Sequence, residues 1–146
     1  MVVHAGPLAI GPLISYETTF SDLARREALL GAELLAFQSS TSSFQGSWTQ
    51  PQLASQPAVR AVEVGRPAVH AGLSGDSSAF DARGRRLAWC PSDFAGVTVV
   101  SIELGSRDTL YRRLGDWVPV TALVVLAGYA GSAGLRRYRM RDTLRA

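Results

Sequence analysis

The sequence predicts an α/β (α+β layered) domain that is followed by one C-terminal transmembrane helix. Short apolar runs alternate with helical segments over residues 8–72, which favours parallel strands joined by crossover helices. A hairpin pattern follows, so the later strands are expected to be antiparallel. Residues 117–135 then continue for nineteen residues without a charge, which is long enough to span a bilayer as a helix.

The domain is expected to begin with a strand and a helix. Residues 8–16 are apolar and predict a buried strand, and Gly11 and Pro12 inside this run predict a bulge. Residues 18–22 are rich in side chains that cap helices, and they precede a helix predicted over 23–30. The glycine that follows is a typical helix stop.

A second strand and a second helix come next. The apolar residues 34–37 predict a buried strand, and the polar, turn-rich residues 38–50 predict a loop. Residues 51–64 have a helical pattern. Pro57 lies inside this helix and is expected to kink or break it.

Two further strands and a hairpin complete the domain. Residues 68–72 predict a third strand, and residues 78–81 and 86–89 flank an Arg-Gly turn as a hairpin. The β-branched residues 97–104 predict the last strand.

The charge distribution favours a membrane over a nucleic acid. The net charge is +3, but five arginines and one acid lie in residues 136–146, whereas residues 1–135 hold ten arginines and eleven acids. The basicity therefore belongs to a tail directly behind the apolar run, and we expect no nucleic-acid partner.

The same tail predicts a membrane topology. Trp117 and Tyr138 bracket the apolar run as interfacial anchors, and the arginines should stay in the cytoplasm. The globular part would then be extracytoplasmic, yet the first residues do not resemble a signal peptide. We therefore expect the chain to be truncated, with membrane helices preceding Met1 in a longer protein.

Few residues are available for metal or redox chemistry. Cys90 is the only cysteine, so an intrachain disulfide is excluded, and we interpret it as a buried, inert thiol. His4 and His70 have no cluster of ligands around them, so we expect neither a metal nor a cofactor. There is no lysine in the chain, which removes any amine for acid–base work.

Six motifs in sequence order resemble those of the apolipoprotein N-acyltransferases, which belong to the nitrilase (carbon-nitrogen hydrolase) superfamily. The similarity covers essentially residues 5–135 and corresponds to the C-terminal portion of the family. Its most specific part is the Arg60–Pro67 segment. The matching motifs are Leu13-Ile14-Ser15-Tyr16-Glu17 with Phe20, Gly31-Ala32-Glu33-Leu34-Leu35, Arg60-Ala61-Val62-Glu63-x-Gly65-Arg66-Pro67, Gly75-x-x-Ser78-Ala79, Gly84-Arg85 and Tyr111-x-x-x-Gly115-Asp116-Trp117.

The resemblance implies a domain organisation and a location. Residues 1–110 would be part of a nitrilase-like α-β-β-α sandwich, 111–116 a linker, 117–135 the membrane helix and 136–146 a basic cytoplasmic tail. The globular part would lie outside the plasma membrane.

The resemblance also implies a chemistry, namely the transfer of an acyl chain from a phospholipid to the N-terminal cysteine of a lipoprotein. Family members use a glutamate base, a lysine for the oxyanion and a cysteine that carries the acyl group. The cysteine position falls on Ser15, and Tyr16 and Glu17 match the next two motif residues, Glu17 as a supporting carboxylate. Serine is a weaker acid than cysteine, and the glutamate and lysine partners are absent here, so we expect the chain alone to be inactive.

Three functions stay open from the sequence. The first is an inactive fragment or degenerate form of the acyltransferase. The second is a non-catalytic, membrane-anchored module that binds lipid or lipoprotein, or pairs with a missing N-terminal half or a full-length relative. The third is a nitrilase-type amidase, which the apolar run 117–135 disfavours.

Several other side chains have two interpretations. Glu17 is either a functional carboxylate or a partner of Arg60 or Arg66 in a structural salt bridge. Phe44 and Trp48 either line a lipid entrance or anchor their loop. Glu63 and Arg66 are interpreted as structural, fixing the end of the helix over 51–64 against the next strand.

Overall fold

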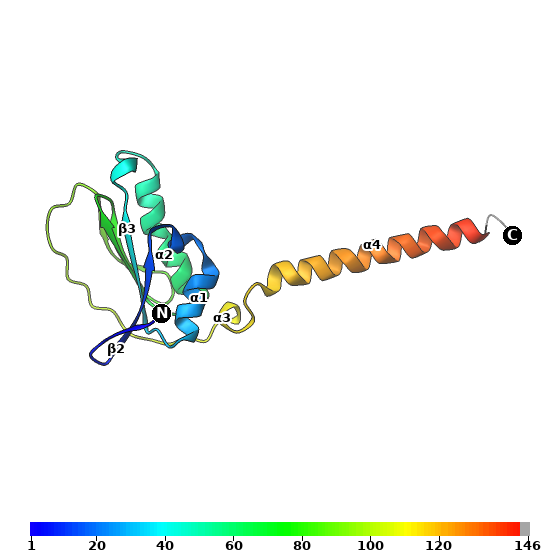
Figure 1. Cartoon of the computed structure of the whole chain (residues 1–146), viewed down its shortest axis with the longest axis horizontal. Helices are drawn as coiled ribbons and strands as arrows, with labels where there is room; N and C mark the ends of the chain where they lie inside the picture. Colours follow the sequence, from blue (N-terminus) through cyan, green and yellow to red (C-terminus); the bar gives the residue numbers. More distant parts are fainter. Residues whose placement is uncertain (144–146) are drawn as a thin grey trace. The chain divides into compact units, whose positions relative to one another are not determined.

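The computed structural model describes the backbone of residues 1–143 and the side chains of residues 1–132. The chain divides into two compact units, Met1–Gly115 and Asp116–Ala146. In the described part of the first unit, a mixed sheet of six strands in the order β1-β2-β3-β4-β5-β6 packs against helices (Figure 1). The predicted α/β class is confirmed.

The sheet has a parallel centre with antiparallel flanks. β2 pairs with β3 and β3 with β4 in parallel, whereas β1, β5 and β6 are antiparallel to their neighbours. The strands predicted over 8–16, 34–37 and 68–72 and the hairpin are confirmed, and the short β1 was missed. The bounds are β1 (Val3–Ala5), β2 (Leu8–Ile14), β3 (Leu34–Ser40), β4 (Ala68–Leu73), β5 (Ser77–Phe80) and β6 (Arg86–Cys90).

The predicted bulge in the first strand is wrong. The pairing of β2 with β3 runs without a shift from Ile10 to Ile14, through both Gly11 and Pro12. Pro12 is tolerated because β1 pairs only with residues 8–10, so on that side β2 is already an edge strand where a missing N–H costs no ladder bond.

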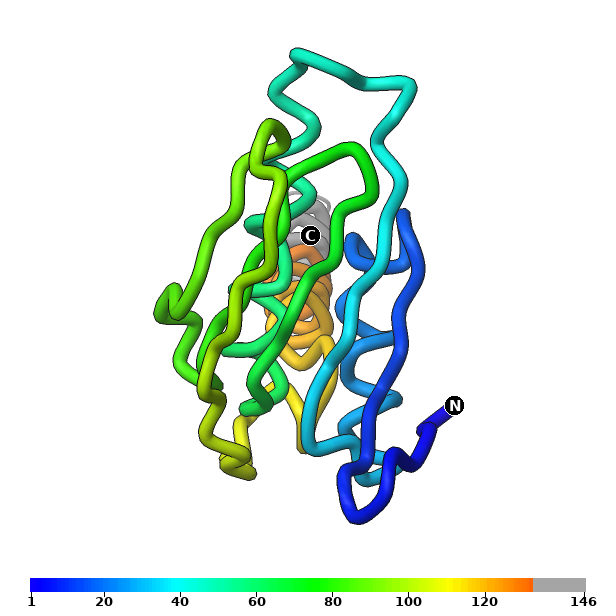
Figure 2. The backbone as a smooth tube through the Cα atoms, turned by 90° about the vertical axis from the view of Figure 1, so that its left-hand side faces the viewer, coloured from blue at the N-terminus to red at the C-terminus, as the bar shows by residue number. Residues whose placement is uncertain are grey.

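Helices cover one face of the sheet. The main ones are α1 (Ser21–Leu29) and α2 (Thr49–Val64), and two short 3₁₀ helices, η1 (Ser15–Thr19) and η2 (Ser42–Phe44), follow β2 and β3. The core lies between sheet and helices, where Leu35 and Phe37 of β3 pack with alanines of α1 and α2. Figure 2 views the sheet from its other side, with α1 and α2 behind it.

Two local predictions around these helices need correction. The residue before α1 is Phe20, which makes no side-chain cap, because residues 15–19 form η1 instead of a capping turn. Pro57 does not break α2, which is continuous around it. The Ser78 hydroxyl donates to the carbonyl of Ala54 at 2.6 Å, which joins α2 to β5 close to the proline.

The predicted strand over 97–104 does not form. This segment is irregular, and the side chains of Val97 and Val99 are 89% and 92% exposed. A β-branched segment becomes a strand only where a neighbouring strand offers hydrogen bonds, and in the described structure none pairs with it.

The segment after residue 105 returns to the ends of the helices. Gly65 ends α2 with φ +66°, and a Cβ there would meet the Arg107 carbonyl at 2.3 Å. Buried Arg66 donates to the carbonyls of Ala32 at 2.8 Å and of Arg107 at 3.3 Å. Arg66 thus has a structural role, but it joins the end of α2 to residues 32 and 107 and not, as predicted, to the next strand.

A short helix, α3 (Leu110–Leu114), is fastened to α1 by one side chain. Nε of Arg25 lies 3.1 Å and 2.9 Å from the carbonyls of Tyr111 and Arg112 and donates to both. Nη2 of Arg25 donates to the carbonyl of Arg113 at 3.2 Å. The guanidinium therefore adds donors to the carbonyls of the last turn of α3, of which that of Tyr111 also accepts the backbone N–H of Gly115 at 2.7 Å.

The second unit contains α4 (Trp117–Thr143). Within the described residues, no helix is sufficiently long and apolar to cross a membrane. The predicted transmembrane helix over 117–135 is therefore not confirmed by the described residues. Residues 133–135 and the predicted tail 136–146 lie outside the described side chains.

Candidate functional site

Ser15 lies at the point where β2 turns into η1. Its φ is +52°, a left-handed conformation that is uncommon for a residue with a side chain. Its carbonyl accepts a hydrogen bond of 2.8 Å from the hydroxyl of buried Thr18. A strained turn between a strand and a helix projects its side chain away from the sheet, which is how several nucleophiles are presented.

Glu17 closes the same turn. Its carboxylate accepts the backbone N–H of Ile14 at 2.7 Å. The predicted salt bridge is wrong, because Glu17 is exposed, Arg60 pairs with Glu63 at 2.9 Å, and Arg66 is engaged with backbone carbonyls. Glu17 therefore shapes the backbone that carries Ser15.

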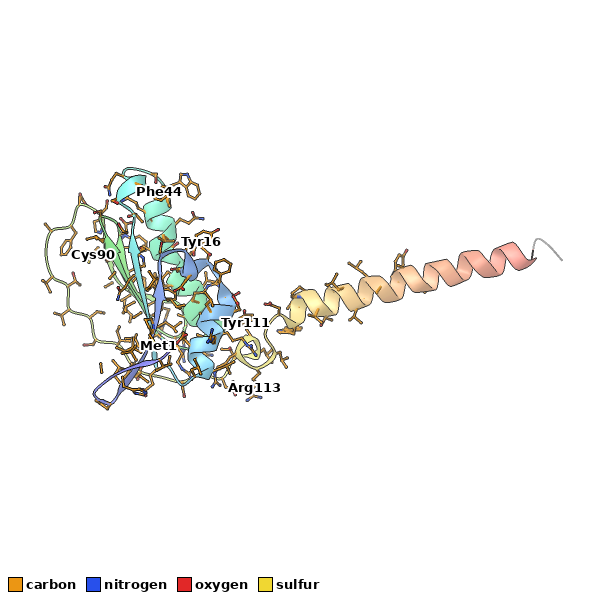
Figure 3. The ribbon with its side chains drawn as sticks, in the orientation of Figure 1. Met1, Tyr16, Phe44, Cys90, Tyr111 and Arg113 are labelled. Carbon is orange, nitrogen blue, oxygen red and sulfur yellow. The ribbon has the colours of Figure 1, made fainter. Side chains whose placement is uncertain are left out.

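Tyr16 points away from the core and is 70% exposed. Its ring packs edge-to-face on Phe20, with 5.6 Å between the ring centroids. Figure 3 labels Tyr16 at the end of β2, beside the helical layer. Tyr16 and Phe20 thus form an exposed aromatic pair beside the Ser15 turn.

A pocket of about 610 Å³ opens where β2, β3 and β4 end. The carboxyl ends of parallel strands commonly carry binding sites in α/β sheets. Apolar and hydroxyl side chains share its wall, so it is suited to an apolar chain with a polar head. The lining residues are Ile14, Ser15, Gln38, Ser39, Ser40, Ala71, Gly72, Leu73 and Ser77.

A second pair of groups in this region was missed from the sequence. The hydroxyl oxygen of Ser39 lies 2.7 Å from Nε2 of His70, and both residues are buried. Nδ1 of His70 lies 3.0 Å from the backbone carbonyl of Asp76. The only available signal was the pairing of neighbouring strands, which no local motif reveals.

The turn between β4 and β5 is held against the loop after β3. The carbonyl of Ser74, a residue with φ +58°, accepts hydrogen bonds from Thr41 at 3.0 Å, Gln45 at 2.6 Å and Gln50 at 2.7 Å. A Cβ at Gly75 would lie 2.1 Å from the Thr41 hydroxyl, so this contact requires glycine. These contacts therefore hold the β4–β5 turn, which directly follows the pocket residue Leu73, in one conformation.

The aromatic side chains of the loop lie elsewhere. Phe44 and Trp48 are 52% and 73% exposed, and neither lines the pocket beside Ser15. The structure does not support their role as a lipid entrance to this pocket. It does not show them as buried anchors of the loop either.

Cys90 is separated from Ser15 by the width of the sheet. It ends β6, whereas Ser15 follows β2, and Figure 3 labels it on the β6 side. Its thiol is half-buried and lies 3.2 Å from the hydroxyl of Thr98. It is therefore no substitute for the residue at position 15.

Comparison with known proteins gives a consistent picture. Residues 2–112 match the family described as carbon-nitrogen hydrolase. An apolipoprotein N-acyltransferase from Gloeobacter violaceus is 33% identical over 132 residues, which are 86% of this chain and 25% of that protein. The enzyme of the same name from Bordetella bronchiseptica is 37% identical over 109 residues, or 75% of this chain and 20% of that protein. The chain thus spans about a quarter or less of these relatives.

Solved structures share the fold. A carbon-nitrogen hydrolase from Helicobacter pylori has a TM-score of 0.55 at 18% identity, covering 62% of this chain and 39% of that one. An amidase of the nitrilase superfamily from Nesterenkonia has a TM-score of 0.54 at 22% identity, covering 64% and 37%. At these identities the likeness concerns the fold alone.

Proposed function

The chain belongs to the carbon-nitrogen hydrolase family, and from this premise we propose that it is the nucleophile-bearing portion of an apolipoprotein N-acyltransferase. The observation that carries the proposal is the left-handed Ser15 in the wall of a partly apolar pocket. The motif resemblance would place the family's cysteine at this residue. The two relatives named above, which are 33% and 37% identical, support the same activity. The substrates would be a phospholipid acyl chain and the N-terminal cysteine of a lipoprotein.

In this proposal the pocket holds the acyl chain and the Ser15 turn holds the reacting carbonyl. Ile14 and Leu73 are 62% and 72% exposed on the pocket wall, which leaves apolar surface for a ligand to cover. Glu17 and Thr18 keep the turn in its strained form. Tyr16 and Phe20, which pack on each other next to the Ser15 turn, do not line the pocket itself.

The chain by itself would not complete the acyl transfer. A serine hydroxyl needs a strong base and a positive or hydrogen-bonding oxyanion site, and the family's lysine has no counterpart because the sequence contains no lysine. We propose that these groups come from a partner layer, either the remaining half of the domain or a full-length relative, which covers the helix-free face of the sheet. The length of the relatives supports this proposal.

A membrane location is also part of the proposal. In the described portion of α4, apolar side chains are exposed on every side of the helix, among them Leu123, Val125 and Leu126 at 63–67%. A helix without a polar face is typical of a lipid environment. We propose that α4 enters the lipid, with the globular unit outside the plasma membrane.

The second candidate is a non-catalytic module that binds lipid or lipoprotein. The serine at position 15 and the absence of lysine favour it. It shares the pocket with the first candidate but requires no partner layer.

Photo-crosslinking tests acyl binding. The full chain is mixed with phospholipid vesicles whose acyl chains carry a diazirine, and crosslinks are mapped by mass spectrometry. We expect crosslinks at Ile14 and Leu73, and their loss in Leu73→Asp. Leu87→Asp, an exposed leucine of β6 outside this pocket, is the matched control. Crosslinks that avoid the pocket would refute acyl binding there.

An acyl-transfer assay separates the two candidates. The chain is incubated with phospholipid and a diacylglyceryl peptide with an N-terminal cysteine, alone and with a full-length relative in which the cysteine is replaced. Transfer only in the mixture supports the acyltransferase portion. No transfer in either sample supports the binding module, and transfer by the chain alone would contradict the proposed need for a partner.

A further inference from the structure

Gln38 interrupts the apolar pattern on the helix-free face of the sheet. The odd-numbered residues of β3 are buried on the helix side, so the even-numbered ones point to the other face. On that face Leu34 and Ala36 precede Gln38, which is exposed and lines the pocket of about 610 Å³. This face of β3 therefore changes from apolar to polar at Gln38, and the change occurs in the wall of the pocket.

The sheet register brings Gln38 close to the Ser15 turn. Gln38 is paired with Ile14 of β2 on one side and with Ala71 of β4 on the other. Neighbouring strands lie about 4.8 Å apart, and paired residues share a face. Ser15 directly follows Ile14 and lines the same pocket. A ligand held by the Gln38 carboxamide therefore lies beside this turn, and the small side chain of Ala71 leaves room for it.

Ser77 supplies a second polar group on the same face. Its neighbour Ser78 points to the helices, where the hydroxyl donates to the carbonyl of Ala54 at 2.6 Å, so Ser77 points to the pocket side. The Ser77 Oγ accepts the backbone N–H of Gly72 at 3.0 Å. That bond uses a lone pair of Oγ, and the hydroxyl proton has no acceptor among the described residues. Continued by one residue, the register of β4 and β5 places Ser77 opposite Ala71, so Gln38 and Ser77 flank this alanine.

The carboxamide of Gln38 has free donors. Among the residues whose side chains are described, it makes no hydrogen bond. The two glutamines that follow it in the sequence, Gln45 and Gln50, are instead both bound to the carbonyl of Ser74. A carboxamide carries two N–H donors, and those of Gln38 are thus open to a ligand in the pocket.

The charge of the pocket selects the kind of ligand. None of its lining residues, all of which have described side chains, is charged. A carboxylate or phosphate would lose its hydration there without meeting an opposite charge, whereas an uncharged carbonyl needs only hydrogen-bond donors. The exposed side chains of Ile14 and Leu73 offer apolar surface for a hydrocarbon chain in the same pocket. The matching ligand is an uncharged ester of a fatty acid.

We propose that Gln38 and Ser77 bind the carbonyl oxygen of a fatty acyl ester, with a side-chain N–H of Gln38 as one donor and the Ser77 hydroxyl as the other. This carbonyl site rests on the proposed function and deepens it, because it names the groups that hold the reacting end of the acyl chain beside Ser15. Both donors belong to this chain, so binding of the carbonyl requires no partner layer.

Two probes that differ only in the carbonyl test the site. Methyl dodecanoate and 1-methoxydodecane have the same chain, but the ether has a methylene where the ester has its carbonyl. Their dissociation constants are measured by equilibrium dialysis against the full chain in one detergent. The dissociation constant of the ether divided by that of the ester is the carbonyl preference. Because each probe is compared between variants in the same detergent, its partition into micelles cancels.

Gln38→Leu should lower the carbonyl preference about 3- to 10-fold, the scale of one hydrogen bond between neutral groups, without weakening the binding of the ether. Gln38→Glu keeps the shape but replaces the N–H donors by a charged acceptor, so it should lower the preference at least as much. Ser77→Ala should lower it by a similar factor. Gln52→Leu, at an exposed position of α2 outside the pocket, is the matched control and should leave it unchanged.

The outcomes separate the carbonyl site from the pocket itself. Binding of both probes with a preference that neither Gln38 variant changes would overturn the role of Gln38 and leave the acyl pocket standing. A preference unchanged in Ser77→Ala would exclude Ser77 from the site. Failure of the unaltered chain to bind either probe would overturn the acyl pocket and the carbonyl site together. Retained binding of the ether shows that a variant is folded, and if Gln38→Leu loses it, Gln38→Glu decides.

Discussion

The carboxylate of Glu17 accepts the backbone N–H of Ile14 at 2.7 Å, so the residue two positions after Ser15 holds the residue before it. This hydrogen bond and the one from Thr18 to the Ser15 carbonyl enclose the left-handed residue from both sides. A motif that resembles a catalytic signature thus has a direct structural task. Glu17 shapes the turn whether or not it also assists the chemistry.

Glu17→Ala should loosen this turn. It removes the acceptor for the Ile14 N–H, and we expect unfolding to become easier by about 1 kcal/mol, the scale of a lost cap. Chemical denaturation measures the change. Glu17→Gln keeps an acceptor oxygen and should lower the free energy of unfolding by less. Equal decreases in both variants would show that the hydrogen bond to Ile14 does not stabilise the turn.

Thr18→Val tests the other half of the turn. The side chain is fully buried, and valine fills the same space without the hydroxyl that serves the Ser15 carbonyl. The free energy of unfolding should fall by about 1–3 kcal/mol because a carbonyl loses its partner. Thr18→Ser retains the hydroxyl and serves as the control for its loss.

Arg66→Lys should destabilise the fold although the charge is kept. The guanidinium donates to carbonyls of residues 32, 65 and 107 at once, a geometry that a single ammonium cannot reproduce. We expect a loss of about 2 kcal/mol in thermal or denaturant unfolding. Arg83→Lys, at an exposed hairpin position, should have almost no effect.

His70 should make stability depend on pH. Its folded-state pKa is lowered by burial, so the unfolded chain binds the proton more readily than the folded one. Stability is therefore fully present above the unfolded value of about 6.5 and is lost as the pH falls through the lower folded pKa.

The midpoint of denaturant unfolding between pH 8 and pH 4 measures this effect. His70→Gln should remove that part of the slope, whereas His4→Gln on exposed β1 should preserve it. An unchanged slope in His70→Gln would contradict the assignment.

Much of the sheet was predictable because its signals are local. The apolar runs, the hairpin turn at Gly84 and the helix stop at Gly31 each depend on neighbouring residues, and all appear where they were expected. The segment 97–104 was mispredicted because its strand-forming residues need a partner strand. Pro12 was taken for a bulge because the sequence does not show that β1 ends at that level of the sheet.

The site was only half predictable for the same reason. Ser15, Tyr16 and Glu17 are adjacent in sequence and were found through a motif. Ser39 and His70 are 31 residues apart and meet only because β3 and β4 are parallel neighbours. The interaction of Arg25 with α3 joins residues 86–88 positions apart and could not be seen either.

Flotation with phospholipid vesicles tests the proposed lipid contact of α4. The paired change Leu123→Asp and Val125→Asp places charges among its exposed apolar side chains and should abolish flotation. Val97→Asp with Val99→Asp alters equally exposed valines outside α4 and should leave flotation intact. Flotation that survives the first pair would contradict the contact.

The most direct test of the account is the reactivity of a thiol placed at position 15. A chain carrying Ser15→Cys with Cys90→Ser is treated with N-ethylmaleimide and with a long-chain alkyl maleimide below its micelle concentration, and the unaltered chain, whose thiol is that of Cys90, is treated in parallel. The quantity compared is the labelling rate by the long-chain maleimide divided by the rate by N-ethylmaleimide. If Ser15 is the nucleophile position of an acyl-binding pocket, this ratio will be higher for the thiol at position 15 than for Cys90. Leu73→Asp will abolish the difference. Equal ratios of the two labelling rates at position 15 and at Cys90 would contradict the account.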